Sequence, residues 1–80
     1  MTKHMDQDKL QVIWGSVRLL RQRVNAQDWI NAFNLYRNLQ AFEDSGPHED
    51  ARLINLCREA CEYYIEQYNL WLRKEVFHYA

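Results

Sequence analysis

The sequence predicts an all-α protein, a three-helix bundle whose C-terminal helix is the longest of the three. Apolar residues recur at spacings of three and four positions along most of the 80 residues, which is typical of helices with one buried face. Only two Gly and one Pro are present, whereas a β protein of this length needs several turns built from Gly, Pro or Asn-Gly. The length accommodates one domain, so we treat residues 1–80 as a single helical domain.

The first predicted helix covers about residues 8–24. Asp6 or Asp8 is a suitable N-cap, because its carboxylate can accept a hydrogen bond from a backbone N–H of the first turn. The expected buried face consists of Leu10, Ile13, Trp14, Val17, Leu20 and Val24. Gly15 lies inside this pattern at a cost of about 1 kcal/mol relative to Ala. We therefore expect a bulky neighbour such as Trp29 to approach Gly15 closely.

The first break in the apolar pattern falls at Asn25. Asn is a good N-cap and also tolerates the left-handed conformation in which many helices end. We expect Asn25 to end the first helix and to begin the second, with the Asp28 carboxylate in the first turn, where it suits the helix dipole. The alternative is one continuous helix through Asn25, which replaces the bundle with a long hairpin.

The second predicted helix covers about residues 26–43. Two adjacent apolar stripes make its buried face wide, as expected for a helix that contacts two neighbours. These stripes contain Trp29, Ile30, Ala32, Phe33, Leu35, Tyr36, Leu39 and Phe42. Gly46 fits the C′ position that follows a helix end, and Pro47 fits the first turn of the next helix.

The third predicted helix covers about residues 48–77. At about 30 residues it is about 45 Å long, against roughly 27 Å for each of the other two. Its first half needs a wide apolar face, because it fills the groove between the shorter helices. The shorter helices are expected to end near residue 70, so the rest of the third helix has no groove to fill. Apolar and aromatic residues nevertheless continue to the C-terminus. The excess consists of Trp71, Leu72, Val76, Phe77 and Tyr79.

The titratable and nucleophilic residues do not form a catalytic or metal-binding pattern. Cys57 and Cys61 are four residues apart on one helix, which suits neither a disulfide nor a zinc site, so we expect buried core thiols. Glu59, Glu62 and Glu66 lack the Glu-x-x-His partners of di-metal bundles and are expected to face solvent. The sequence therefore predicts no enzymatic activity, no metal and no cofactor.

Net charge and hydropathy narrow the remaining classes of protein. A net charge of −1 excludes both a strongly basic nucleic-acid module and an acidic nucleic-acid mimic. No N-terminal apolar run resembles a signal peptide, and no stretch approaches the roughly 20 apolar residues that span a membrane. We expect a soluble, cytoplasmic protein. The succession of helices and turns invites comparison with tetratricopeptide repeats, but the residues at the required positions do not fit them. The sequence resembles no family.

The excess apolar surface of the last helix is the strongest indication of function. Exposed patches of this kind usually mark partner surfaces, and Trp and Tyr are common anchors in them. We expect a small helical interaction module (an adaptor, regulator or inhibitor) that binds a protein partner or forms a homodimer. The binding residues are expected to be Trp71, Leu72, Val76, Phe77 and Tyr79.

The alternative function is a small nucleic-acid-binding transcriptional regulator. Residues 1–25 carry five basic and two acidic side chains, so this part of the chain is locally positive. Arg18, Arg21 and Arg23 are candidates for contacts with phosphates, with Arg37 of the second helix nearby. This alternative predicts binding that falls steeply as salt is added.

Overall fold

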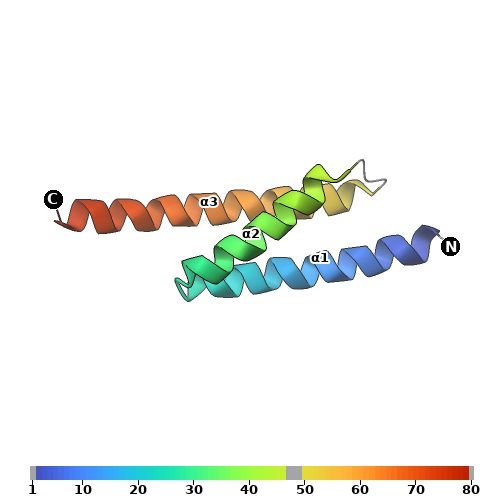
Figure 1. The fold of residues 1–80 in the computed structure, drawn as a ribbon, viewed down its shortest axis with the longest axis horizontal. Coiled ribbons are helices and arrows are strands. Elements are labelled where there is room, and N and C mark those ends of the chain that lie inside the picture. Colours follow the sequence, from blue (N-terminus) through green and yellow to red (C-terminus); the bar gives the residue numbers. More distant parts are fainter. Residues whose placement is uncertain (1, 47–49, 80) are drawn as a thin grey trace.

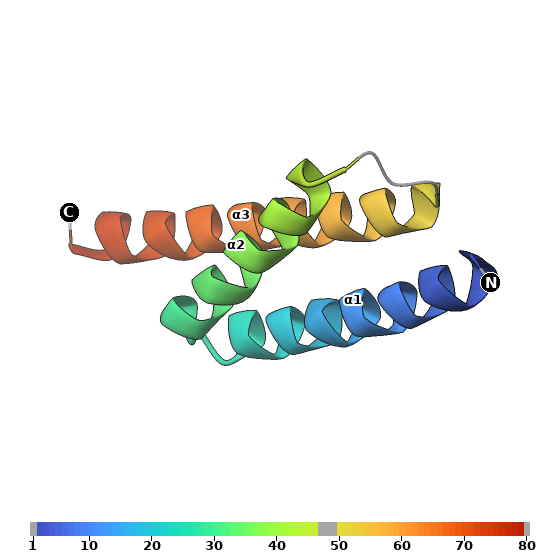
Figure 2. The same ribbon diagram turned by 45° about the vertical axis from the view of Figure 1, so that its right-hand side comes forward.

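The computed structural model of the protein describes the backbone of residues 2–46 and 50–79 and the side chains of residues 8–46 and 50–75. Within these ranges the chain forms three helices, α1 (Thr2–Asn25), α2 (Trp29–Asp44) and α3 (Ala51–Tyr79). Each helix contacts the other two, which confirms the predicted three-helix bundle with a long C-terminal helix. α1 and α3 run in the same direction, and α2 crosses them diagonally on its way back (Figures 1 and 2).

The three helices are staggered along an elongated molecule that measures 57 × 20 × 15 Å. The last part of α3 extends beyond the corner that joins α1 to α2, as Figure 1 shows. This overhang confirms that the two shorter helices end before α3 does. The first residues of α1 and the last residues of α3 lie at opposite ends of the molecule.

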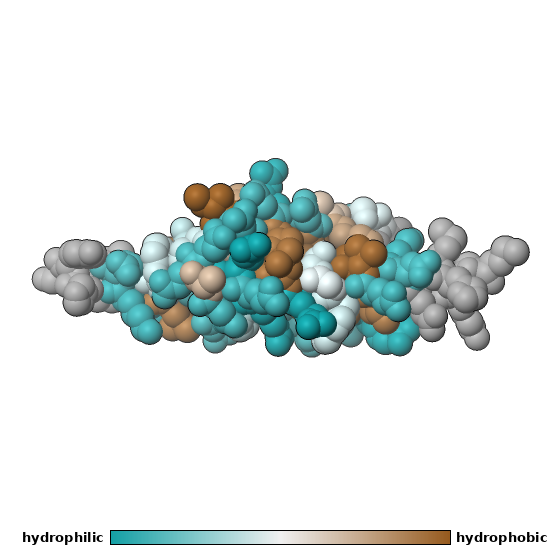
Figure 3. All heavy atoms as spheres, turned by 90° about the horizontal axis from the view of Figure 1, so that it is seen from below, coloured by the Kyte–Doolittle hydropathy of each residue, from teal (hydrophilic) through white to brown (hydrophobic). Residues whose placement is uncertain are grey.

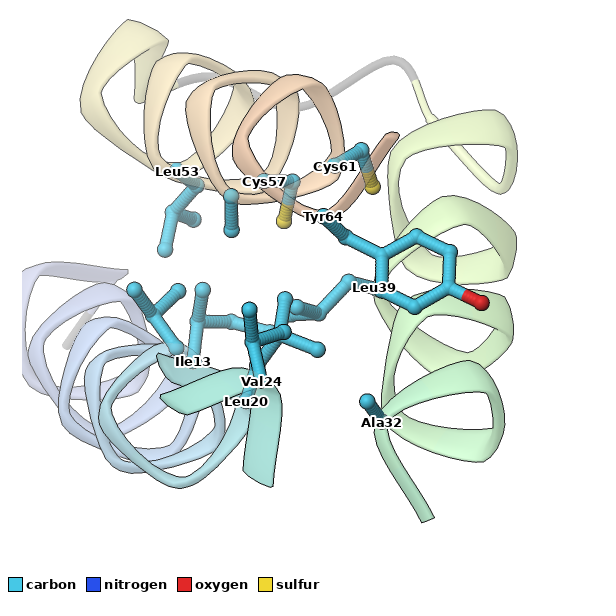
Figure 4. Close-up of a cluster of buried hydrophobic side chains, with 11 residues drawn as sticks. Ile13, Leu20, Val24, Ala32, Leu39, Leu53, Cys57, Cys61 and Tyr64 are labelled. Atoms are coloured by element: carbon cyan, nitrogen blue, oxygen red, sulfur yellow. The ribbon is translucent and has the colours of Figure 1, made fainter. Parts of the chain in front are cut away.

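The core fills the space between the three helices, and all of them direct side chains into it (Figure 4). Its buried members are Ile13, Val17, Leu20, Val24, Ala32, Leu39, Leu53, Cys57, Ala60, Cys61 and Tyr64. Leu20, Leu39 and Leu53 are fully buried, one from each helix. The buried residues of α3 end at Tyr64 within the described part of the chain, and the partly buried Tyr68 packs against the core beyond it.

A corner of three residues separates α1 from α2, so the alternative of one continuous helix is wrong. Asn25 does not form this corner, because it is the last residue of α1. Gln27 adopts the left-handed conformation instead, with φ of 58°. The N–H of Gln27 binds the carbonyl of Val24 at 3.0 Å, and the N–H of Asp28 binds the carbonyl of Arg23 at 2.8 Å. These two bonds are the Schellman pattern, which ends many helices.

Asp28 completes the end of α1 and also caps α2. Its carboxylate accepts the backbone N–H of Asn31 at 3.4 Å and the side-chain amide of Asn31 at 2.7 Å. The Asn31 amide, which favours the charged carboxylate, is the main reason that the pKa of Asp28 is lowered. The two roles predicted for Asn25 therefore belong to two other residues: Gln27 has the left-handed conformation that ends α1, and Asp28 caps α2.

We expect Gln27→Gly to raise the free energy of unfolding by about 1 kcal/mol, as measured by urea denaturation. The left-handed conformation crowds the Cβ of Gln27, and glycine has no Cβ. Ala26→Gly is the matched control, because Ala26 precedes Gln27 and its φ is not positive. This control should lose stability, since glycine adds only freedom to the unfolded chain there. A loss of stability in both variants would contradict strain at Gln27.

The boundaries of the last two helices also differ from the predicted ones. α2 ends at Asp44 with Ser45 as its cap, whose hydroxyl donates to the carbonyl of Phe42 at 2.8 Å. Gly46 does not have the positive φ expected of a C′ glycine. α3 begins at Ala51 rather than near residue 48, and Pro47 lies outside the described residues.

Asp50 caps α3 and fixes its first residue. The backbone N–H of Arg52 donates to the Asp50 carboxylate at 2.9 Å, and the Arg52 guanidinium donates to it at 2.7 Å. These bonds hold the pKa of Asp50 below its usual value, with the guanidinium contributing most. At the other end of the chain, α1 begins at Thr2, so Asp6 and Asp8 lie within the helix and do not cap it.

Gly15 lies on an exposed part of α1, and nothing packs against it. A Cβ at this position would meet no neighbouring atom within 4 Å. The expectation that Trp29 packs against Gly15 is therefore wrong. Trp29 contacts the aromatic residues of α3 instead.

Candidate interaction surface between α2 and α3

The residues predicted to bind a partner begin where the core ends. Trp71 and Leu72 are half-buried. The backbone of α3 is helical through Tyr79, but the side chains of Val76, Phe77 and Tyr79 lie outside the described residues. Only the first two of the five predicted binding residues can therefore be placed.

Trp71 belongs to a row of aromatic rings that joins α2 to α3. The members of this aromatic row are Trp29, Phe33 and Tyr36 of α2, and Tyr64, Tyr68 and Trp71 of α3. Tyr36 stacks on Tyr64 with ring centroids 4.8 Å apart, and Trp29 lies 5.5 Å from Trp71. The three aromatic residues of α2 and the three of α3 have the same spacing in the sequence, an interval of four residues followed by one of three. This match is visible in the sequence as two pairs of intervals, although periodicity alone did not indicate that the two sets of rings contact each other.

An open groove of about 480 Å³ follows the aromatic row on the outer side of the molecule. It is lined by Trp29, Ile30, Phe33, Asn34, Tyr64 and Tyr68. Two apolar side chains of α2 stand at its edge, Ile30 at 79 % exposed and Phe33 at 45 % exposed. Ile65 of α3, also at the molecular surface, is 44 % exposed. The sequence predicts that Ile30 and Phe33 lie on the buried face of the second helix, and this is wrong for both.

The indole of Trp29 lies between this groove and a second one of about 420 Å³. The second groove is lined by Val24, Asn25, Gln27, Trp29, Gln67, Leu70, Trp71 and Lys74. The Nε1 atom of Trp29 is buried and has no hydrogen-bond acceptor among the described residues. A buried donor without an acceptor lowers stability, so the contacts of the Trp29 ring must outweigh this cost.

A further apolar groove of about 480 Å³ lies between α1 and α3, at the end where α3 begins. Its apolar lining consists of Leu10, Trp14 and Leu56. Trp14 is 52 % exposed, so its predicted place in the buried face of the first helix is wrong. Seen from below, the molecule has several separate hydrophobic areas with hydrophilic residues between them (Figure 3).

Three of the four arginines predicted to face nucleic acid contact different parts of the bundle. Arg21 lies over the ring of Tyr63 in α3, at 5.3 Å, whereas Arg23 pairs with Asp28 at the corner, at 3.7 Å. Arg37 lies over the ring of its neighbour Phe33 in α2, at 5.9 Å. The fourth, Arg18, is exposed on α1. Arg21, Arg23 and Arg37 therefore each have a different contact within the bundle.

The two cysteines are free and buried, as the sequence predicts. Burial raises the pKa of Cys61 to about 11 and that of Cys57 in the same direction, so the thiolate is scarce at neutral pH. Glu59, Glu62 and Glu66 are exposed, also as predicted. Among the described side chains, no three His, Cys, Asp or Glu residues are grouped as metal ligands.

The described helices give no indication of a membrane span, because none is both long enough and apolar enough to cross a bilayer. Exposed apolar and aromatic groups from two helices meet at the surface between α2 and α3. In comparisons with protein-family models, curated proteins and solved structures, nothing matches this chain.

Proposed function

We propose that the protein is a helical interaction module that binds another protein chain through the surface between α2 and α3. We define this α2–α3 face as Ile30, Phe33 and Tyr68, which line one groove, together with Ile65 and Leu72. These two residues lie three positions before and four positions after Tyr68 and are therefore its neighbours on the surface of α3. The observation that supports it best is the 79 % exposure of Ile30 at the edge of an aromatic groove. Full burial of an Ile or Phe side chain stabilises a complex by about 1.5–3 kcal/mol, and such faces usually mark partner sites.

The proposed role requires binding and no chemistry, as in an adaptor, regulator or inhibitor. The α2–α3 face continues along α3 toward the residues that the sequence singled out, Val76, Phe77 and Tyr79. We propose a homodimer as the simplest assembly. A net charge of −1 opposes self-association only weakly, and a second copy would stabilise a domain with so small a core.

The mass in solution tests this proposal, measured by sedimentation equilibrium from micromolar to hundreds of micromolar protein. We expect a mass above the 9.8 kDa of one chain, and we expect Ile30→Asp to return it to that value. An Asp at this position lies in the first turn of α2, where the helix dipole favours a carboxylate, so the fold should persist. Val12→Asp is the matched control, since Val12 is 67 % exposed on α1 and should not affect the mass.

The same pair of variants tests binding to a different protein. Host proteins retained by the immobilised wild-type chain should be lost with Ile30→Asp and kept with Val12→Asp. A monomeric wild type whose retained proteins are the same for all three chains would contradict the proposed function.

A further inference from the structure

The exposed side of α3 carries the spacing of a two-stranded coiled coil. Ile65, Asn69 and Leu72 follow one another at intervals of four and three residues, and the sequence continues this spacing to Val76 and Tyr79. Alternation of three and four residues is the pattern of the seam along which two helices pack. Ile65 is 44 % exposed and Asn69 is exposed, so neither α1 nor α2 covers this seam fully.

Charged residues beside the seam specify the direction of a second helix. Glu66 and Arg73 are exposed, lie seven residues apart and therefore flank the seam on the same side. If a second α3 runs antiparallel, with Ile65 opposite Val76 of the other copy, each Glu66 lies beside Arg73 of the other copy. A parallel arrangement in register offers neither residue an opposite charge. The sequence of α3 is therefore complementary to itself in the antiparallel direction.

The same arrangement covers the uncovered side chains of α2. In this register residues 73–77 of the second α3 would pass beside residues 64–68 of the first. That is where α2 exposes its apolar residues, since Phe33 and Ile30 line one groove together with Tyr64 and Tyr68. The apolar tail of one copy would then cover the exposed face of the other, and two-fold symmetry repeats this contact. The apolar end of α3 and the exposed apolar residues of α2 would then cover each other between the two copies.

We propose that two copies of this chain associate through an antiparallel pair of α3 helices, with Ile65 opposite Val76 and two flanking Glu66–Arg73 ion pairs. The proposal rests on the proposed function and specifies the partner, the direction and the register. Asn69 interrupts the apolar seam opposite Leu72, which limits the affinity of the pair. Asn69→Leu should therefore lower the dissociation constant of the dimer about tenfold.

Charge reversal tests the direction and register. Glu66→Arg and Arg73→Glu each place two like-charged pairs in the dimer. Each should therefore raise the dissociation constant of the dimer about tenfold at low salt. The double variant restores both pairs with their charges exchanged and should return the constant to within about threefold of wild type. High salt should reduce the differences between all four chains. Sedimentation equilibrium measures the constants, and far-UV circular dichroism confirms that each variant is folded.

Glu59→Arg is the matched control for the change in net charge. Glu59 is exposed on α3 but lines the groove with Trp14, on the side facing α1, and its reversal should leave the dissociation constant unchanged. A double variant that dimerises no better than the single variants would overturn the antiparallel register, while the interaction function would stand. A wild-type chain that stays monomeric would also overturn the pairing, and partner retention by Ile30→Asp would then decide the proposed function separately.

Discussion

Leu20→Ala is expected to lower the free energy of unfolding by about 3 kcal/mol. Leu20 is fully buried at the centre of the core, and truncation leaves a cavity that the surrounding helices fill only in part. An 80-residue domain is stable by about 4–12 kcal/mol in total, so this single change removes a large share of it. Urea denaturation followed by far-UV circular dichroism measures the loss.

The neighbouring residue offers a direct control for this prediction. Leu19 precedes Leu20 in α1 but is 38 % exposed, so Leu19→Ala should cost less than about 1 kcal/mol. Equal losses in the two variants would mean that α1 is rotated about its axis relative to the structure described above.

Trp29→Ala is expected to destabilise the protein by about 3 kcal/mol or more. The indole contacts three rings of α3, with centroids 6.2 Å from Tyr64, 5.3 Å from Tyr68 and 5.5 Å from Trp71. Removal of the indole therefore separates the start of α2 from α3. Urea denaturation measures the loss, and near-UV circular dichroism should show that the aromatic row has lost its fixed packing.

Trp29→Phe separates the contribution of the ring contacts of Trp29 from that of its Nε1–H group. It keeps a ring in the row and removes the Nε1–H that has no acceptor among the described residues, so it should cost about 1 kcal/mol or less. If Phe costs as much as Ala, the indole N–H contributes to stability and must have an acceptor after all.

The sequence predicts the class of fold and the buried face of α1 well, because both depend on helical periodicity. Ile13, Val17 and Leu20 follow that periodicity and are buried. It does not predict the corner, because the left-handed preference of Asn is weak compared with tertiary contacts. The amide of Asn25 instead accepts a hydrogen bond from the hydroxyl of Tyr63 in α3 at 3.1 Å, a contact between residues far apart in the chain.

The candidate site was harder to predict, since periodicity shows that a helix has an apolar face but not how much of it neighbours will cover. Ile30 and Trp29 are adjacent in two equally apolar stripes, yet Trp29 contacts α3 and Ile30 faces solvent. The diagonal crossing of α2 over α3 decides between them, and no local pattern encodes that crossing angle. The overhang of α3 was predicted from helix lengths, but α1 has 24 residues and is longer than predicted. The overhang therefore depends also on the stagger between α1 and α3, which the sequence did not predict.

The parallel course of α1 and α3 has a practical consequence for anyone who attaches a label to this protein. Because α1 begins and α3 ends at opposite ends of a molecule 57 Å long, a fusion partner attached before α1 is held far from the overhang of α3. The same fusion on the C-terminus is carried on the overhang itself, where it would obstruct whatever docks there. Affinity tags and surface-immobilisation handles therefore belong before α1.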